Sequence, residues 1–209
     1  WEIEERYQPL GSFCIATTER ARSVFLFSKR PFDELDGAEI GITEQTSTSV
    51  RLLKVLLSNV WSARPARFSS IHRAANDAFL LIGDDALRMR AGVPEFPHMA
   101  DLGAVWTEWT SLPFVFARWV ARRDLRGADR DRLCAMLERA IANNWKQLDR
   151  IAVSRGAELG MSVHEVREYL EGFRFVATHE EHKAMAKFRE LDTATRADEA
   201  AAIAREESA

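Results

Sequence analysis

A strand, a turn rich in hydroxyl groups and a helix follow one another from residue 38, and this succession constrains the fold most. Residues 38–43 predict a short buried strand, and the apolar residues from Val50 on recur at helical spacing. The turn between them is Thr-Ser-Thr-Ser at 46–49, so we expect a helix from Ser49 to about Val60. A helix opening leaves N–H groups unpaired and carries a positive partial charge. Such a turn suits a carboxylate or a phosphate.

Thr48 and Ser49 are therefore the main candidates for contacts to an anionic ligand. The alternative interpretation is that Ser47 or Thr48 only caps the helix, as Ser and Thr do in many proteins that bind nothing there. The stretch alone leaves both interpretations open.

The composition is that of an ordinary globular protein. The 209 residues, 46% of them hydrophobic, suffice for one large domain or two small ones. A formal net charge of -3 gives no general attraction to nucleic acid or to an anionic membrane, so neither is expected as a partner. Cys14 and Cys134 lie far apart and match no metal or redox spacing, which favours a reducing compartment such as the cytoplasm.

The order of strand, tight turn and helix recurs at residues 78–90. The apolar run 78–82 precedes Gly83 and Asp84, and a short helix is expected around 86–90. Such alternation predicts an α/β protein with a parallel sheet, whose ligands bind beyond the carboxyl ends of the strands. Gly83 and Asp84 are candidate contacts at that edge, although an Asp at this place is at least as often a helix cap.

Further strands are predicted on either side of these units. Residues 13–16 and 24–27 are apolar runs of strand length, and the turn at 32–37 is interpreted as a crossing between two lobes. The aromatic-rich region after residue 101 predicts a buried crossing strand at 114–119 with the tryptophans packed around it.

The remainder of the chain is predicted to be helical. An apolar stripe predicts one amphipathic helix over residues 129–153, and capping-box patterns at Ser162 and Thr178 predict two further helix starts. His179 and His182 are accompanied by no third ligand of matching spacing, so we expect solvated side chains and no metal site. The Ala- and Glu-rich end is expected to be frayed helix or disorder.

Four segments in the right order carry a family resemblance. They are Arg22–Ser28, Thr46–Leu53, Leu81–Asp84 and Asp101–Ala117, the last containing Asp-Leu-Gly, a Trp and Leu-Pro-Phe-Val-Phe-Ala. Together they resemble the menaquinone biosynthesis family of the futalosine pathway, and within it the chorismate dehydratases most. The resemblance covers roughly residues 7–190.

This resemblance implies a periplasmic-binding-protein-like fold (type 2) of two α/β lobes with the ligand in the cleft between them. Residues 36–100 would form the inserted smaller lobe, and residues 1–35 and 101–209 the larger lobe, which ends in a helical region. The activity implied is that of a hydro-lyase, a carbon–oxygen lyase that converts chorismate to 3-[(1-carboxyvinyl)oxy]benzoate and water. Neither a metal nor an organic cofactor is implied.

Formation of an aromatic ring drives this reaction, so the protein has mainly to hold a dicarboxylate, help hydroxide leave and place a base near the ring proton. One hypothesis is that the enolpyruvyl carboxylate of the substrate is that base. The resemblance carries Thr48 and Ser49 over as carboxylate contacts, with Gly83 and Asp84 as further cleft residues.

The chain also departs from the family pattern. Members begin with a strand carrying a Ser-Tyr-Leu-Asn-like motif, then a helix, a strand, a further helix and a serine-bearing turn, none of which occurs in these 209 residues. The functional Asn of that motif has no position here, so no catalytic residue is assigned. We expect the larger lobe to lack its first strands, and the chain alone to self-associate and to show no measurable dehydration until an upstream segment is supplied.

Two other functions stay open at this point. One is the sister enzyme of the same family, 1,4-dihydroxy-6-naphthoate synthase. The other is a solute-binding module without catalysis. The sequence does not predict the oligomeric state.

Overall fold

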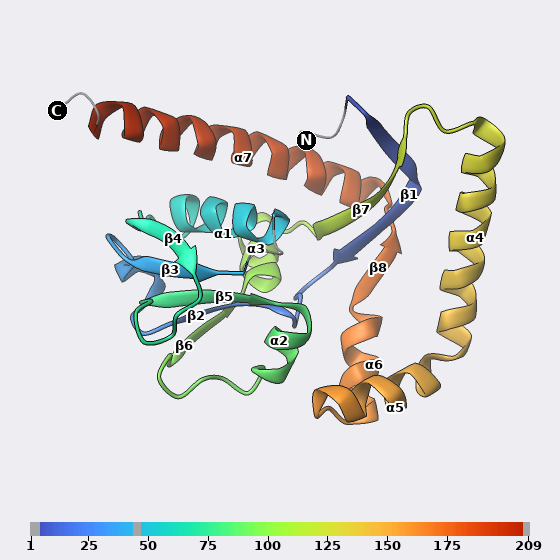
Figure 1. Cartoon of the computed structure of the whole chain (residues 1–209), viewed down its shortest axis with the longest axis horizontal. Coiled ribbons are helices and arrows are strands. Elements are labelled where there is room, and N and C mark those ends of the chain that lie inside the picture. The colour runs from blue at the N-terminus through green and yellow to red at the C-terminus, as the bar shows by residue number, and fades with distance from the viewer. Residues whose placement is uncertain (1–4, 44–46, 207–209) are drawn as a thin grey trace.

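Strands and helices alternate along the computed structural model, which describes residues 5–43 and 47–206. The α/β class predicted from the sequence is confirmed. The strands form two sheets, and Figure 1 shows the helices packed against and between them. In chain order the elements are β1 (Tyr7–Thr17), β2 (Val24–Ser28), the 3-10 helix η1 (Phe32–Glu34), β3 (Glu39–Ile42), α1 (Thr48–Asn59), β4 (Arg67–Ser70), β5 (Ala78–Ile82), α2 (Gly83–Arg88), β6 (His98–Asp101), α3 (Leu102–Thr110), β7 (Phe114–Arg122), α4 (Gly127–Lys146), α5 (Leu148–Leu159), α6 (Val163–Glu171), β8 (Phe173–Val176) and α7 (His179–Glu206).

The larger sheet has five strands in the order β4-β3-β5-β2-β6. β3 pairs in parallel with β4 and β5, as the two strand–turn–helix units predict, whereas β2 is antiparallel to β5 and β6. All of β2 is buried because both faces of the sheet are covered. α1 and α3 contribute to the core on one face, and α2 contributes to the core on the other.

The smaller sheet has three antiparallel strands in the order β7-β1-β8. Its own core is a cluster of three small buried residues, Cys14, Ala16 and Ala177, with Val115 packed against it. α4, α5 and α6 connect β7 to β8, and α7 then runs back across the molecule to pack on α1 (Figure 1).

Strand β2 lies in the five-stranded sheet, although the predicted lobe division assigned residues 1–35 to the other lobe. Because β2 pairs along its whole length with β5 and β6, a boundary at residue 36 divides this sheet. The chain passes from one sheet to the other at residues 18–23, between β1 and β2. The turn at 32–37, interpreted as a crossing, instead connects two strands of the same sheet.

The carboxylate of Asp101 fixes this passage. Its Oδ1 accepts N–H groups of Ala21 at 2.9 Å, Gly103 at 2.9 Å and Ala104 at 3.1 Å, and its Oδ2 accepts the N–H of Arg22 at 2.6 Å. Asp101 therefore caps α3 and holds the chain between β1 and β2 at the same time. Gly103 permits this approach, because a Cβ there would lie 2.7 Å from the N atom of Ala21.

The return passage, from α3 into β7, is fixed by a second set of hydrogen bonds. The indole Nε1 of Trp106 donates to the carbonyl of Pro113 at 3.0 Å. The Thr110 hydroxyl donates to the Trp106 carbonyl at 2.8 Å and accepts the N–H of Leu112 at 3.2 Å. Ser111, between them, has a positive φ of 57° and ends the helix.

The predicted crossing strand exists as β7, but it is not buried as predicted, because only Phe114 of residues 114–119 is buried. The tryptophans near it are not all buried either. Trp106 is fully buried against Phe114, with ring centroids 5.3 Å apart. Trp109 and Trp119 are 38% and 51% exposed, respectively, so the prediction that the tryptophans pack around the strand is wrong for these two.

The C-terminal third is helical, with two corrections. The single helix predicted over residues 129–153 is divided at Gln147 into α4 and α5. The capping box at Ser162 is confirmed, and at Thr178 the N–H donates to the Glu181 carboxylate at 2.8 Å. Although burial raises it, hydrogen bonds from Thr178 hold the pKa of Glu181 below its ordinary value.

The expectation of a frayed or disordered end after residue 193 is wrong up to Glu206, where α7 ends. Asp192 pairs with Arg51 of α1 at 2.9 Å, and Glu199 pairs with Lys54 at 3.0 Å. These ion pairs hold α7 against α1 in a way that no local sequence pattern reveals.

The first prediction concerns the Asp101 carboxylate. Asp101→Asn replaces one carboxylate oxygen by an NH2 group, which cannot accept hydrogen bonds from backbone N–H groups. The free energy of unfolding is therefore expected to fall by about 2–4 kcal/mol. Urea unfolding monitored by circular dichroism measures this, with Asp33→Asn, exposed in η1, as the control. An unchanged unfolding free energy would contradict the role assigned to Asp101.

A second prediction concerns acid stability. Hydrogen bonds from Ser162 and then from Arg90 lower the pKa of Glu165 from 4.5 to about 2. A lowered folded-state pKa contributes stability above pH 4.5 that is lost as the pH falls towards 2. Glu165→Gln is therefore expected to flatten the dependence of the melting temperature on pH in this window. Glu138→Gln, on the exposed side of α4, is expected to leave the dependence unchanged.

Candidate functional site

The opening of α1 lies directly after β3, as predicted. Thr48 is its first residue and is partly buried, and Ser49 is buried with 6% of its surface exposed. Ser47 stands at the cap position, but its side chain makes no capping hydrogen bond, and the first turn contains no acidic residue. The simple capping interpretation is therefore not observed for Ser47. Residues 44–46, which include Thr46 of the predicted hydroxyl turn, lie outside the described residues.

A buried hydroxyl precedes this helix opening. The Oγ1 atom of Thr43, directly after β3, is inaccessible to solvent and has no hydrogen-bond partner among the residues described. A buried polar group without a partner costs free energy. In the part of the chain that the structure describes, Thr17, Arg30, Arg118 and Thr195 also carry such an atom. α1 begins at Thr48, and the first N–H groups of this helix offer hydrogen-bonding capacity of the kind that a carboxylate uses.

Gly83 lies at the same edge of the sheet. β3 and β5 are parallel neighbours, paired at Ile40–Ala78 and Gly41–Phe79, so both strands end towards the same side. The structure thus brings the two predicted turns to one sheet edge. Gly83 has a φ of +60°, and its N–H donates to the Ser23 carbonyl at 2.8 Å, so this N–H is already used.

Asp84 is engaged by a residue far along the chain. Both carboxylate oxygens of Asp84 accept from the same terminal nitrogen of Arg155 in α5, at 2.9 and 2.8 Å. The hydrogen bond and charge of Asp84 raise the pKa of Arg155 above its ordinary value. In this structure Asp84 therefore connects α2 to α5.

Sequence reasoning missed a polar cluster beside these residues. The Tyr169 hydroxyl of α6 donates to Ser23 Oγ at 3.1 Å, and Arg22 pairs with Glu168 at 2.7 Å. Burial raises the pKa of Tyr169 despite its hydrogen bond with Ser23. The cluster joins residues 146 positions apart in sequence, so no local motif signals it.

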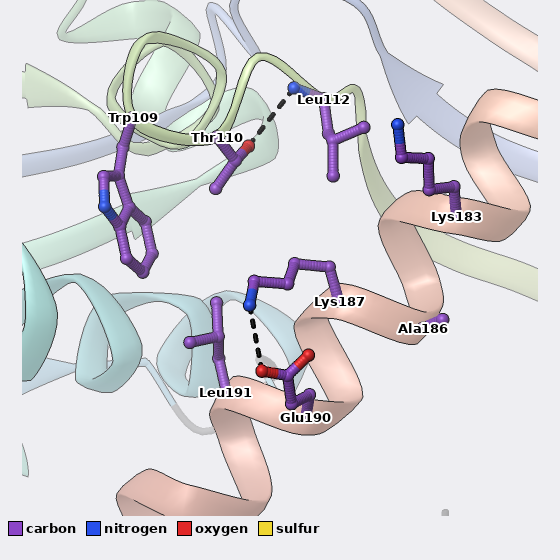
Figure 2. Close-up of a pocket in the computed structure, with 8 residues that line it drawn as sticks. All are labelled: Trp109, Thr110, Leu112, Lys183, Ala186, Lys187, Glu190 and Leu191. Atoms are coloured by element: carbon purple, nitrogen blue, oxygen red, sulfur yellow. Dashed lines mark hydrogen bonds and ion pairs between the residues drawn. The ribbon is translucent and has the colours of Figure 1, made fainter.

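A shallow groove of about 620 Å³ lies elsewhere, between the end of α3 and α7 (Figure 2). Figure 2 shows the Trp109 ring on one side and the lysines of α7 on the other, with Lys187 paired to Glu190 at 2.9 Å. Thr48, Ser49, Gly83 and Asp84 do not line it.

The described residues contain neither a cluster of metal ligands nor a helix that could span a membrane. Within residues 5–43 and 47–206, no three His, Cys, Asp or Glu side chains converge as a metal site would require. Over the same part of the chain, no helix combines the length and the hydropathy needed to cross a bilayer.

Comparison with known proteins places these features in a family. A family model described as menaquinone biosynthesis matches residues 1–193. A curated chorismate dehydratase from Thermus thermophilus is 31% identical over 200 residues, a match that covers 87% of this chain and 72% of the relative.

A solved structure gives the same fold at lower sequence identity. Protein AF1704 from Archaeoglobus fulgidus superimposes with a TM-score of 0.67 and 19% identity, covering 92% of this chain and 74% of AF1704. The chain therefore belongs to the menaquinone biosynthesis family. It shares its α/β architecture with AF1704, consistent with the periplasmic-binding-protein-like fold that the resemblance implied.

Proposed function

We propose that this protein is a chorismate dehydratase, a hydro-lyase that converts chorismate to 3-[(1-carboxyvinyl)oxy]benzoate and water. The observation that carries the proposal is the 31% identity to a curated chorismate dehydratase over 87% of the chain. The free thiols of Cys14 and Cys134 fit the reducing cytoplasm, where we place the reaction.

In this proposal the opening of α1 holds one carboxylate of the substrate. The hydroxyls of Thr48 and Ser49 and the N–H groups of the first turn donate to it, and the helix dipole favours its charge. The unpartnered hydroxyl of Thr43 is a third donor of the right type. We propose Gly83 and Asp84 as further residues that line the ligand cleft. The Asp84 carboxylate also accepts a hydrogen bond from Arg155.

Fixing the dicarboxylate in one orientation is the main contribution to catalysis that the proposal assigns to this chain. Loss of the ring hydroxyl and of a ring proton gives an aromatic product, so positioning supplies much of what the reaction needs. We also propose that the two lobes follow the two sheets, with the inserted lobe beginning near residue 24 rather than at residue 36.

A direct assay tests the activity. Chorismate is added to the chain fused to the part of the Thermus thermophilus relative that lies outside the match, and products are identified by chromatography with mass spectrometry. The expected result is one 3-[(1-carboxyvinyl)oxy]benzoate for each chorismate consumed. Unchanged chorismate in a fusion that circular dichroism shows to be folded would overturn the proposal, and turnover of a cyclic futalosine-derived substrate instead would identify the naphthoate synthase.

A third prediction separates ligand binding from helix capping. In the same fusion, Thr48→Ala/Ser49→Ala removes two donors to a charged group, each worth about 1.5–3 kcal/mol, so affinity for the product is expected to fall about tenfold or more. The free energy of unfolding is expected to fall by no more than about 1 kcal/mol. Calorimetry and urea unfolding measure the two effects. Ser58→Ala, exposed on the same helix, is the matched control. A double variant that unfolds earlier yet binds as tightly as the parent would show that these hydroxyls only cap α1.

A fourth prediction concerns Asp84. If its carboxylate contacts substrate, Asp84→Asn weakens product binding, whereas Arg155→Gln breaks the same ion pair and leaves binding intact. Both changes are expected to cost at most about 1 kcal/mol of stability, because the pair is exposed. An equal loss of product affinity in the two variants would mean that binding depends on the ion pair between Asp84 and Arg155 and not on a contact between the Asp84 carboxylate and the substrate.

A further inference from the structure

The hydroxyl of Tyr169 lies at the same sheet edge as the candidate site. It donates to Oγ of Ser23 at 3.1 Å, and the Ser23 carbonyl accepts the N–H of Gly83 at 2.8 Å. Tyr169 reaches this edge from α6, which leads into β8 of the three-stranded sheet. Figure 1 shows α5 and α6 next to α2, where the two halves of the molecule meet. The hydroxyl therefore lies at the boundary between the two halves.

The Tyr169 hydroxyl is held in place and is protonated at neutral pH. Its ring packs edge-on against Phe173, with centroids 5.0 Å apart. Burial raises the pKa of Tyr169, the hydrogen bond with Ser23 lowers it, and of the two nearby charges Asp84 raises it and Arg155 lowers it. Because Asp84 of α2 and Arg155 of α5 are paired with each other at 2.8 Å, their charges oppose one another at the hydroxyl. Tyr169 thus has a proton to donate.

The hydrogen bond between Tyr169 and Ser23 can change direction. A hydroxyl both donates and accepts, so either side chain can supply the proton of this bond. Oγ of Ser23 is 3.4 Å from the carbonyl oxygen of Ala21, which is longer than the usual O–H···O distance of about 2.7–2.8 Å. Little is lost when Ser23 turns its proton to Tyr169 instead. The Tyr169 hydroxyl is then free to donate to a ligand.

The spacing of the strands sets the distance from Tyr169 to the opening of α1. β5 lies between β3 and β2, and neighbouring strands are about 4.8 Å apart, so the end of β3 and the start of β2 are separated by about 10 Å. Chorismate carries its ring hydroxyl on the carbon opposite the ring carboxylate. A six-membered ring with these two groups, and one hydrogen bond at each end, spans a similar distance. A chorismate whose ring carboxylate binds at the opening of α1 can therefore present its ring hydroxyl to Tyr169.

We propose that Tyr169 is a catalytic residue that donates the proton with which the ring hydroxyl of chorismate leaves as water, an inference that rests on the proposed function. The bond between the ring carbon and the hydroxyl oxygen breaks, and the oxygen keeps the electron pair and takes the proton of Tyr169. The neighbouring ring carbon gives its proton to the base, and the electron pair of that C–H bond completes the aromatic ring. The Tyr169 phenolate regains a proton from the base or from solvent, so the sum is chorismate to product and one water.

This proton transfer is favourable because a phenol is a stronger acid than water. The ordinary pKa of tyrosine is about 10, whereas that of water is about 15.7. A raised pKa at Tyr169 still leaves the phenol able to protonate a departing hydroxide. The charge that forms on the Tyr169 oxygen is stabilised by the nearby guanidinium of Arg155.

Kinetics of the fusion described above test the role of Tyr169. Tyr169→Phe keeps the ring but removes the proton, so kcat is expected to fall about a hundredfold or more, as on loss of a general acid. The affinity for the product, measured by calorimetry, is expected to stay unchanged, because the product lacks the ring hydroxyl. Tyr7→Phe changes the other tyrosine of the 209 residues and is the matched control, expected to leave kcat unchanged.

Ser23→Ala separates proton donation from a structural role. It breaks the same hydrogen bond as Tyr169→Phe but leaves the phenol, so kcat is expected to fall by less than about tenfold. Equal losses of kcat in the two variants, or the parent kcat in Tyr169→Phe, would overturn the assignment. A parent fusion that is folded but does not turn over chorismate would instead overturn the proposed function, and the assignment with it.

A replacement that keeps the hydroxyl makes the test decisive if Tyr169→Phe does not fold. A fluorinated tyrosine at position 169 retains the hydrogen bond to Ser23 and has a lower phenol pKa. Because the phenol must be protonated to act, kcat is expected to fall as the pH rises through the pKa of Tyr169, and fluorination is expected to move this fall to lower pH. A pH dependence that fluorination does not move would overturn the assignment.

Discussion

The carboxylate of Asp101 is the interaction on which the arrangement of this molecule depends. By accepting four backbone N–H groups it joins the end of β6, the start of α3 and the passage between β1 and β2. Ser23 follows Arg22, whose N–H Asp101 accepts. The Ser23 carbonyl accepts the N–H of Gly83, and the Ser23 hydroxyl accepts a hydrogen bond from the Tyr169 hydroxyl. One charged group therefore sets how the two sheets meet, and with that the surroundings of the sheet edge at which the candidate site lies.

Elements stabilised locally were predictable from the sequence. The strands β3 and β5 are apolar because both faces of their sheet are covered, and a helix follows each as predicted. α1 starts at Thr48, next to the predicted Ser49, whereas α2 starts at Gly83, inside the predicted turn and before the predicted helix around 86–90. The capping box at Ser162 is predictable for the same reason, since its two hydrogen bonds span three residues.

Pairings between segments far apart in the sequence gave no such local signal. Strand β8 is partly exposed and pairs with β1 at Phe13–Val176, so it carries no buried apolar run of its own. The local sequence predicts a lobe crossing at 32–37, and only the distant partners of β2 show that this turn stays within one sheet.

The same distinction holds for the candidate site. Thr48 and Ser49 were identifiable because a helix opening with hydroxyl groups is a local pattern with a physical consequence, the partial positive charge of the helix. The partner of Asp84 was not identifiable, because Arg155 lies 71 residues away and reaches it only through the packing of α5 beside α2. Family resemblance supplied the substrate class, which neither composition nor spacing contains.

A structure of the protein with 3-[(1-carboxyvinyl)oxy]benzoate bound is the most direct measurement of the central claim, that the opening of α1 is the carboxylate site. We expect one product carboxylate within hydrogen-bonding distance of the Thr48 and Ser49 hydroxyls and of the first-turn N–H groups, with the Thr43 hydroxyl now paired. A product molecule bound away from α1, for example in the groove between Trp109 and Lys183 (Figure 2), with Thr43 still unpartnered, would contradict it.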